Sequence, residues 1–202
     1  MEIAMVKKLI LLSFILCAAA CTAKPASTPL PTPSTGQIDM EQQAVYAFLL
    51  SNLYQHRGYV IMDTTATGVT GVENTTQTLD YVLQNMHSVD SGTVVSFRSR
   101  NDAAYPISPD MNIGGQYTLL SQAGRQQIFG ENQSGWEIFY ERYPQAPGIT
   151  TLSRVGFNNS LDQALVYIGT QSNWLAGSGY YILLKKLNGA WNIDQRVMTW
   201  IS

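Results

Sequence analysis

Apolar residues recur at intervals of three and four in three segments before residue 144, namely 45–53, 79–86 and 136–143. This spacing puts the apolar side chains of each segment on one face of a helix, so each is predicted to be an amphipathic helix. The third segment has the clearest boundaries. Residues 134–137 read Ser-Gly-Trp-Glu, the pattern of a capping box, and Pro144 follows as a stop signal.

The rest of the chain contains shorter segments that are typical of strands. Extended runs are predicted at 59–62, 93–97, 117–120 and 152–157. After Pro147 the apolar period changes from helical to alternating, and 164–168 is apolar at both alternations, as in a strand buried on both faces. Segments 180–187 and 190–200 flank Asn188-Gly189, the two-residue signal of a type I′ hairpin.

These elements predict an α+β fold, in which N-terminal helices cover one face of a curved antiparallel sheet that ends in a C-terminal meander or hairpin. The chain divides into a signal peptide at 1–20, a tether at 21–36 and one α+β domain at 37–202. A domain of this length buries about 70% of the surface of its unfolded chain, so its core needs no disulfide or metal.

The first 21 residues have the organisation of an export signal. Lys7 and Lys8 precede an apolar run at 9–20, which is too short to cross a hydrocarbon core about 30 Å thick. Small residues before Cys21 resemble the lipobox of bacterial lipoproteins, which implies lipid attachment, including palmitate, at Cys21. The pattern departs from that family at Ala18, where Leu is usual. Cleavage after Ala20 that leaves a free Cys21 is the alternative, and translation starts at Met1 or at Met5.

The segment after Cys21 suits an anchored domain. Residues 22–35 are rich in Pro, Ser and Thr, a composition that favours an extended tether of about 40 Å. Thr22 follows the cysteine where Asp would be an inner-membrane signal, so in a Gram-negative cell the resemblance implies the outer membrane. We therefore expect a cell-envelope protein that contacts the membrane through its lipid anchor.

Charge narrows the set of partners. The chain has 12 basic and 14 acidic residues, and removing Glu2, Lys7 and Lys8 with the leader leaves 10 and 13. This slightly acidic balance excludes nucleic acid as a partner, because nucleic-acid binding needs a basic surface. It also disfavours direct binding to an anionic membrane. The two cysteines both precede the domain, so no intrachain disulfide is expected in it.

Five motifs in the last third carry a further resemblance. They are Ser153-Arg154-Val155-Gly156-Phe157-Asn158, Gln163-Ala164-Leu165-Val166-Tyr167, Gly177-Ser178-Gly179-Tyr180-Tyr181, Gly189-Ala190-Trp191-Asn192-Ile193 and Trp200-Ile201-Ser202. Together they resemble a family of uncharacterised bacterial envelope lipoproteins, from Trp136 to the end of the chain. Some members carry a cysteine pair where Ser172 and Ala176 stand here. The family has no established activity, so the resemblance implies a location rather than a reaction.

A more remote similarity concerns the fold alone. Helices before a curved sheet whose last hairpin reads Asn-Gly-x-Trp-x-Ile are similar to the ketosteroid-isomerase and nuclear-transport-factor-like superfamily. That similarity implies a pocket between sheet and helices. Such pockets serve enzymes, binding proteins and dimerisation modules alike.

No residue pattern defines a catalytic or metal site. His56 and His87 each lie near the end of a predicted helix and lack metal-ligand spacing, so a cation at a helix terminus is the simpler interpretation. The motif at 177–179 is Gly-Ser-Gly, which fits a turn better than a nucleophile elbow. Asp80 and Asp162 would act as bases only if they were buried, and both are expected in solvent. We expect no catalytic residue, no metal and no cofactor.

Three side chains are candidate contacts for a ligand or partner. Trp174 lies in a predicted loop at 170–179, where it either plugs the fold or anchors a partner. Tyr140 belongs to the aromatic face of the third helix, which is expected to be mostly core. Arg154 lies in an apolar strand, so it either pairs with Glu137 or Glu141 or recognises an anion in a pocket.

The sequence thus predicts a lipid-anchored envelope protein that serves as a non-enzymatic binding or interaction module, whose partner is an envelope protein or a small molecule. The alternative is a small-molecule pocket or enzyme of the ketosteroid-isomerase-like type. A pocket predicts a sizeable cavity lined by Tyr and Trp. An interaction module predicts a filled interior and an exposed apolar patch.

Overall fold

The structure is a computed structural model that describes residues 32–54, 58–67, 75–130 and 134–202. Its elements, in chain order, are α1 (Thr35–Tyr54), β1 (Tyr59–Met62), α2 (Thr75–Gln84), α3 (Ser91–Arg100), β2 (Tyr117–Leu120), α4 (Gln122–Phe129), α5 (Gly135–Arg142), β3 (Ile149–Leu152), β4 (Gly156–Phe157), β5 (Gln163–Asn173), β6 (Ala176–Leu187) and β7 (Ala190–Ile201). Cys21 and most of the predicted tether lie outside the described residues. No helix in the described ranges is long and apolar enough to cross a membrane.

One mostly antiparallel sheet organises these elements, in the order β2-β1-β3-β5-β6-β7, with β4 paired to β5. β1 runs parallel to both β2 and β3, and the other pairs are antiparallel. The C-terminal meander β5-β6-β7 confirms the predicted α+β class. Its last turn has φ of 53° at Asn188 and 82° at Gly189, the positive values that a type I′ turn requires.

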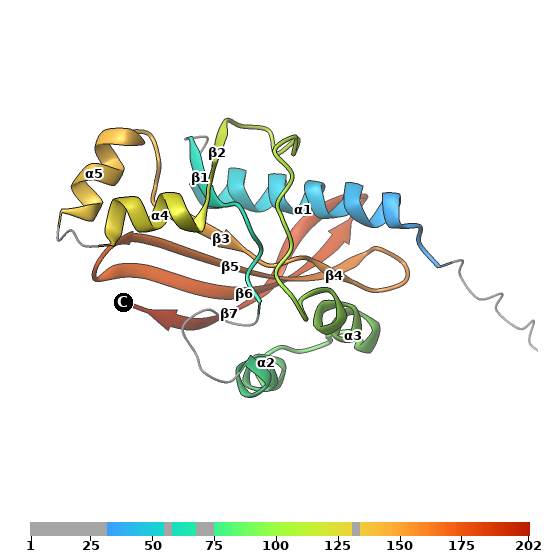
Figure 1. Cartoon of the computed structure of the whole chain (residues 1–202). Helices are drawn as coiled ribbons and strands as arrows, with labels where there is room; N and C mark the ends of the chain where they lie inside the picture. The colour runs from blue at the N-terminus through green and yellow to red at the C-terminus, as the bar shows by residue number, and fades with distance from the viewer. Residues whose placement is uncertain (1–31, 55–57, 68–74, 131–133) are drawn as a thin grey trace, which may run out of the picture.

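Helices cover both faces of the sheet, and not only the predicted one (Figure 1). We call the face that carries Ile168 and Ile182 the first face, and the face that carries Tyr167 and Tyr181 the second face. α1 packs on the first face, where the largest core cluster lies. α2 and α3 pack on one part of the second face, and α4 and α5 pack on the part formed by β1 to β3. The β5 side chains on both faces of the sheet are apolar because each face contacts a helical layer.

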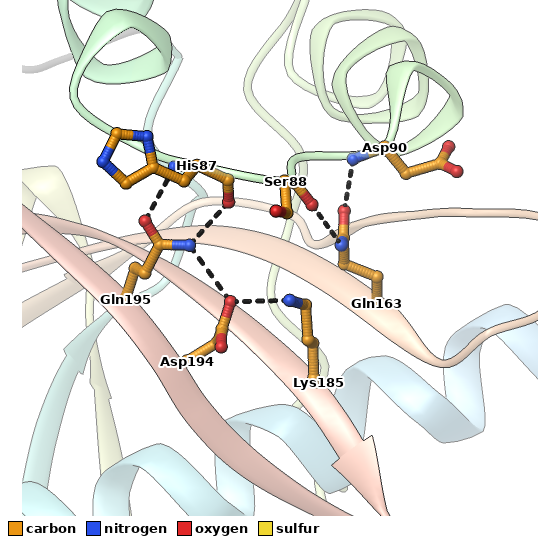
Figure 2. A network of polar contacts seen from close by, with 7 residues as sticks. All are labelled: His87, Ser88, Asp90, Gln163, Lys185, Asp194 and Gln195. Atoms are coloured by element: carbon orange, nitrogen blue, oxygen red, sulfur yellow. Dashed lines mark hydrogen bonds and ion pairs between the residues drawn. The ribbon is translucent and has the colours of Figure 1, made fainter.

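Two glutamines fasten the segment between α2 and α3 to the second face (Figure 2). The Gln163 amide accepts from the backbone N–H of Asp90 at 2.6 Å and donates to the Ser88 carbonyl at 3.0 Å. The Gln195 amide accepts from His87 N–H at 2.7 Å and donates to the His87 carbonyl at 2.6 Å. We call this pair the glutamine clamp. It positions α2 and α3 through their connection and not only through apolar packing.

Asp194 supports the clamp from β7. Gln195 also donates to the Asp194 carboxylate at 3.1 Å, and Lys185 lies 3.0 Å from the same carboxylate oxygen (Figure 2). The hydrogen bond from Gln195 is the main cause of the lowered pKa of Asp194, and Lys185 adds to it. The carboxylate therefore stays ionised and helps to orient the Gln195 amide.

Several predicted elements are wrong in detail. The run at 93–97 belongs to α3, which Asp90 caps by accepting from Gly92 N–H at 2.7 Å. α4 was not predicted, although Ser121 caps it by accepting from Gly124 N–H. Ser134 is the N-cap residue of α5 but makes no side-chain capping bond, so the capping box does not form.

The predicted strand at 152–157 is divided into β3 and β4. Between them the Ser153 hydroxyl accepts from Tyr167 N–H at 2.8 Å and donates to the Arg154 carbonyl. These bonds satisfy backbone groups at the break between β3 and β4, which both pair antiparallel with β5. Gly156 then lies directly against the backbone of Phe97 in α3, where a Cβ would overlap the Phe97 nitrogen. Glycine allows this close approach of α3 to the sheet.

Candidate functional site

A groove of about 770 Å³ opens on the second face, beside the start of α4. Its base comes from adjacent strands, because Thr151 of β3 pairs with Gly169 of β5 and Ile149 pairs with Gln171. Its sides come from the start of α4, from residues 64–67 after β1, and from the ends of β5 and β7. A concavity of this size suits a drug-sized ligand. We call this site the groove.

Trp200 of β7 lies across a platform of glycines at one side of the groove. A Cβ on Gly179 would overlap the Trp200 Nε1, and one on Gly177 would lie 2.8 Å from the Trp200 ring. The indole reaches β5, where Nε1 donates to the Tyr167 hydroxyl at 2.8 Å. The Gly-Ser-Gly motif is therefore not the predicted turn. It lies inside β6 and makes room for the indole.

Trp174 lies at another side of the groove, in the short turn between β5 and β6 and not in the predicted ten-residue loop. Its ring meets Phe129 of α4 edge-on at 5.8 Å and lies 6.5 Å from Trp136 of α5. About half of the side chain stays exposed, at 48%. The residue is thus partly a plug against the α4–α5 layer and partly a surface contact.

Tyr140 supports the same corner without lining the groove. Its hydroxyl donates to the Ser172 carbonyl at 2.8 Å, which ties α5 to the end of β5. Partial burial raises the pKa of Tyr140, so the phenol stays protonated and keeps this bond. Its ring packs against Trp136 and Phe139, as expected for a core-facing aromatic stripe.

Arg125 is the charged side chain that lines the groove, and no Asp or Glu side chain lines it. Its guanidinium lies 5.9 Å from the centre of the Phe129 ring. Among the described residues, no carboxylate lies within ion-pair distance of Arg125. Among the side chains that line the groove, aromatic and neutral polar groups thus lie beside one basic group, Arg125.

Arg154 lies at a different place and has a different partner from the predicted one. Its guanidinium stacks over the Tyr105 ring at 4.4 Å, beside a smaller hollow of about 300 Å³ that Asp39 also lines. The expected pairing with Glu137 or Glu141 is wrong, because α5 packs against α4, β1 and β3 and the described residues contain no ion pair to Arg154.

The residues weighed for catalysis remain apart from the groove. Asp80 pairs on the surface with Arg98 at 2.7 Å, and Asp162 accepts from the Asn158 amide at 2.7 Å. His87 is exposed, and His56 lies outside the described residues. Within the described ranges, no group of three or more His, Cys, Asp or Glu side chains could hold a metal ion.

Sequence reasoning identified Trp174 but missed Trp200 and Arg125 as groove residues. The three glycines opposite one tryptophan were a signal for a ring lying on a sheet. The place of Arg125 depended on α4, which was not predicted. Comparison of the chain with protein families, with curated proteins and with solved structures finds no match.

Proposed function

We propose that the protein is a lipid-anchored component of the bacterial cell envelope whose domain binds a small organic molecule in the groove, without catalysing a reaction. The observation that carries this proposal is the groove itself, which brings Trp174, Trp200 and Tyr167 together with Arg125. Pockets of this kind bind ligands through aromatic surface and a few polar groups. A ketosteroid-isomerase-like reaction would need a general base in the groove, and its lining residues include no His, Asp or Glu.

A direct test is native mass spectrometry of the full chain, purified from the bacterial host in a detergent that carries no sugar. We expect a reproducible extra mass of a few hundred daltons. Trp174→Ala should reduce the share of protein that carries this mass, because it removes one side of the groove. Tyr81→Ala is the matched control, since Tyr81 is similarly exposed, at 53%, and does not line the groove.

A second candidate function is docking of an envelope protein at the rim of the groove. Leu175 and Ile201 are 85% and 71% exposed and adjoin the two tryptophans in sequence. Exposed apolar residues in a cluster mark interaction sites. If no extra mass is found, and a photocrosslinker at Leu175 captures the same protein in intact cells while one at Tyr81 does not, this second function replaces the first.

A further inference from the structure

The groove contains several polar side chains that the fold does not use. Thr64, Thr67, Thr151, Gln122 and Gln171 all line it, and none of these side chains forms a hydrogen bond with another described residue. Each can both donate and accept. A wholly apolar ligand would bury them without partners, at a cost of about 1–3 kcal/mol for each group that loses water. The lining therefore suits a ligand that is rich in hydroxyl or amide groups.

The same groove offers a flat apolar surface in a fixed orientation. The glycines at 169, 177 and 179 and the hydrogen bond to Tyr167 hold the Trp200 indole against the sheet. A sugar ring has hydroxyl groups around its edge and a C–H surface on its face, so it can stack on an indole while its hydroxyl groups bond to Thr and Gln side chains. A sugar ring would therefore use both features of the groove at once.

The charge of Arg125 narrows the class of ligand that the groove suits. Arg125 faces the groove without a carboxylate partner among the described residues, and no acidic side chain lines the site. A guanidinium binds a carboxylate by two parallel hydrogen bonds. We propose that the ligand of the groove is a short oligosaccharide that contains an acidic sugar. Its rings stack on Trp200, and its carboxylate is held by Arg125. This inference rests on the proposed function and names the ligand class for the same site.

Calorimetric titration of the full chain, in lauryldimethylamine oxide, tests the inference with three probes: tetragalacturonic acid, maltotetraose and chitotetraose. We expect the acidic probe to bind most tightly. Arg125→Gln should remove that preference and leave the neutral probes unchanged, because only the charge contact is lost. Arg142→Gln is the matched control, since Arg142 is exposed on α5 and does not line the groove.

Thr151→Val tests the hydroxyl contacts while keeping the size of the side chain and the strand. We expect it to weaken sugar binding about 5-fold, the effect of one hydrogen bond worth about 1 kcal/mol. Thr118→Val, an exposed position on β2 outside the groove, should leave binding unchanged. Circular dichroism of each variant shows whether it is folded, so a lost contact is not confused with unfolding.

The possible results separate the two proposals. Sugar binding that Arg125→Gln and Thr151→Val leave unchanged would overturn the inference, because the sugar would then bind elsewhere. If no probe binds, but the native protein carries a non-saccharide mass that Trp174→Ala removes, the ligand class is wrong and the proposed function stands. If no probe binds and no mass is found, both proposals fail.

Discussion

Trp200 shows how single residues shape the groove. The indole occupies the space above Gly179 that any larger residue would fill, and the φ of Gly179 lies outside the positive region, so the backbone itself would accept alanine. The glycine is therefore required by packing and not by backbone conformation. This distinction makes its replacement a clean probe of where the ring lies.

Gly179→Ala should destabilise the domain by about 1–3 kcal/mol, because the new Cβ would overlap Trp200 and displace the ring. Urea denaturation followed by circular dichroism measures the change. In a Trp200→Ala background the same substitution should cost less than half as much, because the three atoms nearest to the new Cβ all belong to the Trp200 ring. Gly36→Ala at the start of α1 is the control, since its Cβ would meet nothing within 4 Å. Equal costs in both backgrounds would show that the ring lies elsewhere.

Two buried tyrosine side chains make the stability of the domain depend on pH in the alkaline range. Tyr46 and Tyr181 are each 1% exposed, and burial raises the pKa of both well above the ordinary value of 10.0. The unfolded chain therefore ionises these tyrosines at a lower pH than the folded protein does. Their contribution to stability is complete below about pH 10 and is lost as pH rises above it.

The free energy of unfolding should accordingly fall by about 1 kcal/mol per pH unit for each such tyrosine above about pH 10. Tyr46→Phe should flatten this slope. It should also lower stability at neutral pH by about 1 kcal/mol, because Tyr46 donates to the Ser153 carbonyl at 2.7 Å. Urea denaturation at a series of pH values measures both effects. Tyr81→Phe, at an exposed position, should change neither, and a slope unchanged in Tyr46→Phe would contradict the assignment.

At the scale of elements, the glutamine clamp makes α2 and α3 depend on two side chains of the sheet. Gln163 is 6% exposed, and it satisfies one N–H and one carbonyl of the connection between the helices. Removing the amide leaves both backbone groups without this partner. The effect should be local, because α1 packs on the opposite face of the sheet and α5 belongs to a separate core cluster.

Gln163→Ala should cost about 1–3 kcal/mol. Hydrogen exchange should show faster exchange at 87–90 and in α2 and α3, with α1 unchanged. Gln127→Ala, at an exposed position of α4, is the control and should leave the exchange pattern as it is. Uniformly faster exchange over the whole domain would mean that the clamp is part of the global core and not a local fastener.

The same scale shows what a sequence can predict. The helix at 45–53, strands β1 and β2 and the last hairpin were predictable because their signals are local: spacing, alternation and Asn188-Gly189. α3 was mistaken for a strand because Thr93, Val94 and Val95 are β-branched, and the cap at Asp90 outweighs that preference. The groove joins 64–67, the start of α4, β3 and the end of β7, and no local pattern reports which distant segments meet.

At the scale of the whole molecule, the groove is lined by segments that lie far apart in the chain, from the end of β1 to the end of β7. The clamp fixes α2 and α3 to the sheet, and Tyr140 ties α5 to β5. Neither the clamp nor Tyr140 lines the groove itself. Binding at the groove should therefore slow hydrogen exchange at the start of α4 and in the β5–β6 turn, and leave the clamp region unchanged.

The anchor is the remaining whole-molecule prediction, and Cys21→Ser tests it. If Cys21 is lipidated, the variant should lose labelling by radioactive palmitate and move to the soluble fraction, because about 0.8 kcal/mol per buried methylene is then lost. Cys17→Ser is the matched control and should keep label and location, since the leader is removed.

Reaction with a maleimide separates lipidation from cleavage after Ala20. Cys21 is the last cysteine in the chain, so a free thiol after cleavage at Ala20 would react, whereas a lipidated one would not. Reaction with the maleimide, or palmitate label that persists in Cys21→Ser, would overturn the lipoprotein proposal. Either outcome leaves the proposal for the groove open to its own tests, because α1 begins only at Thr35 and the groove-lining residues all follow it.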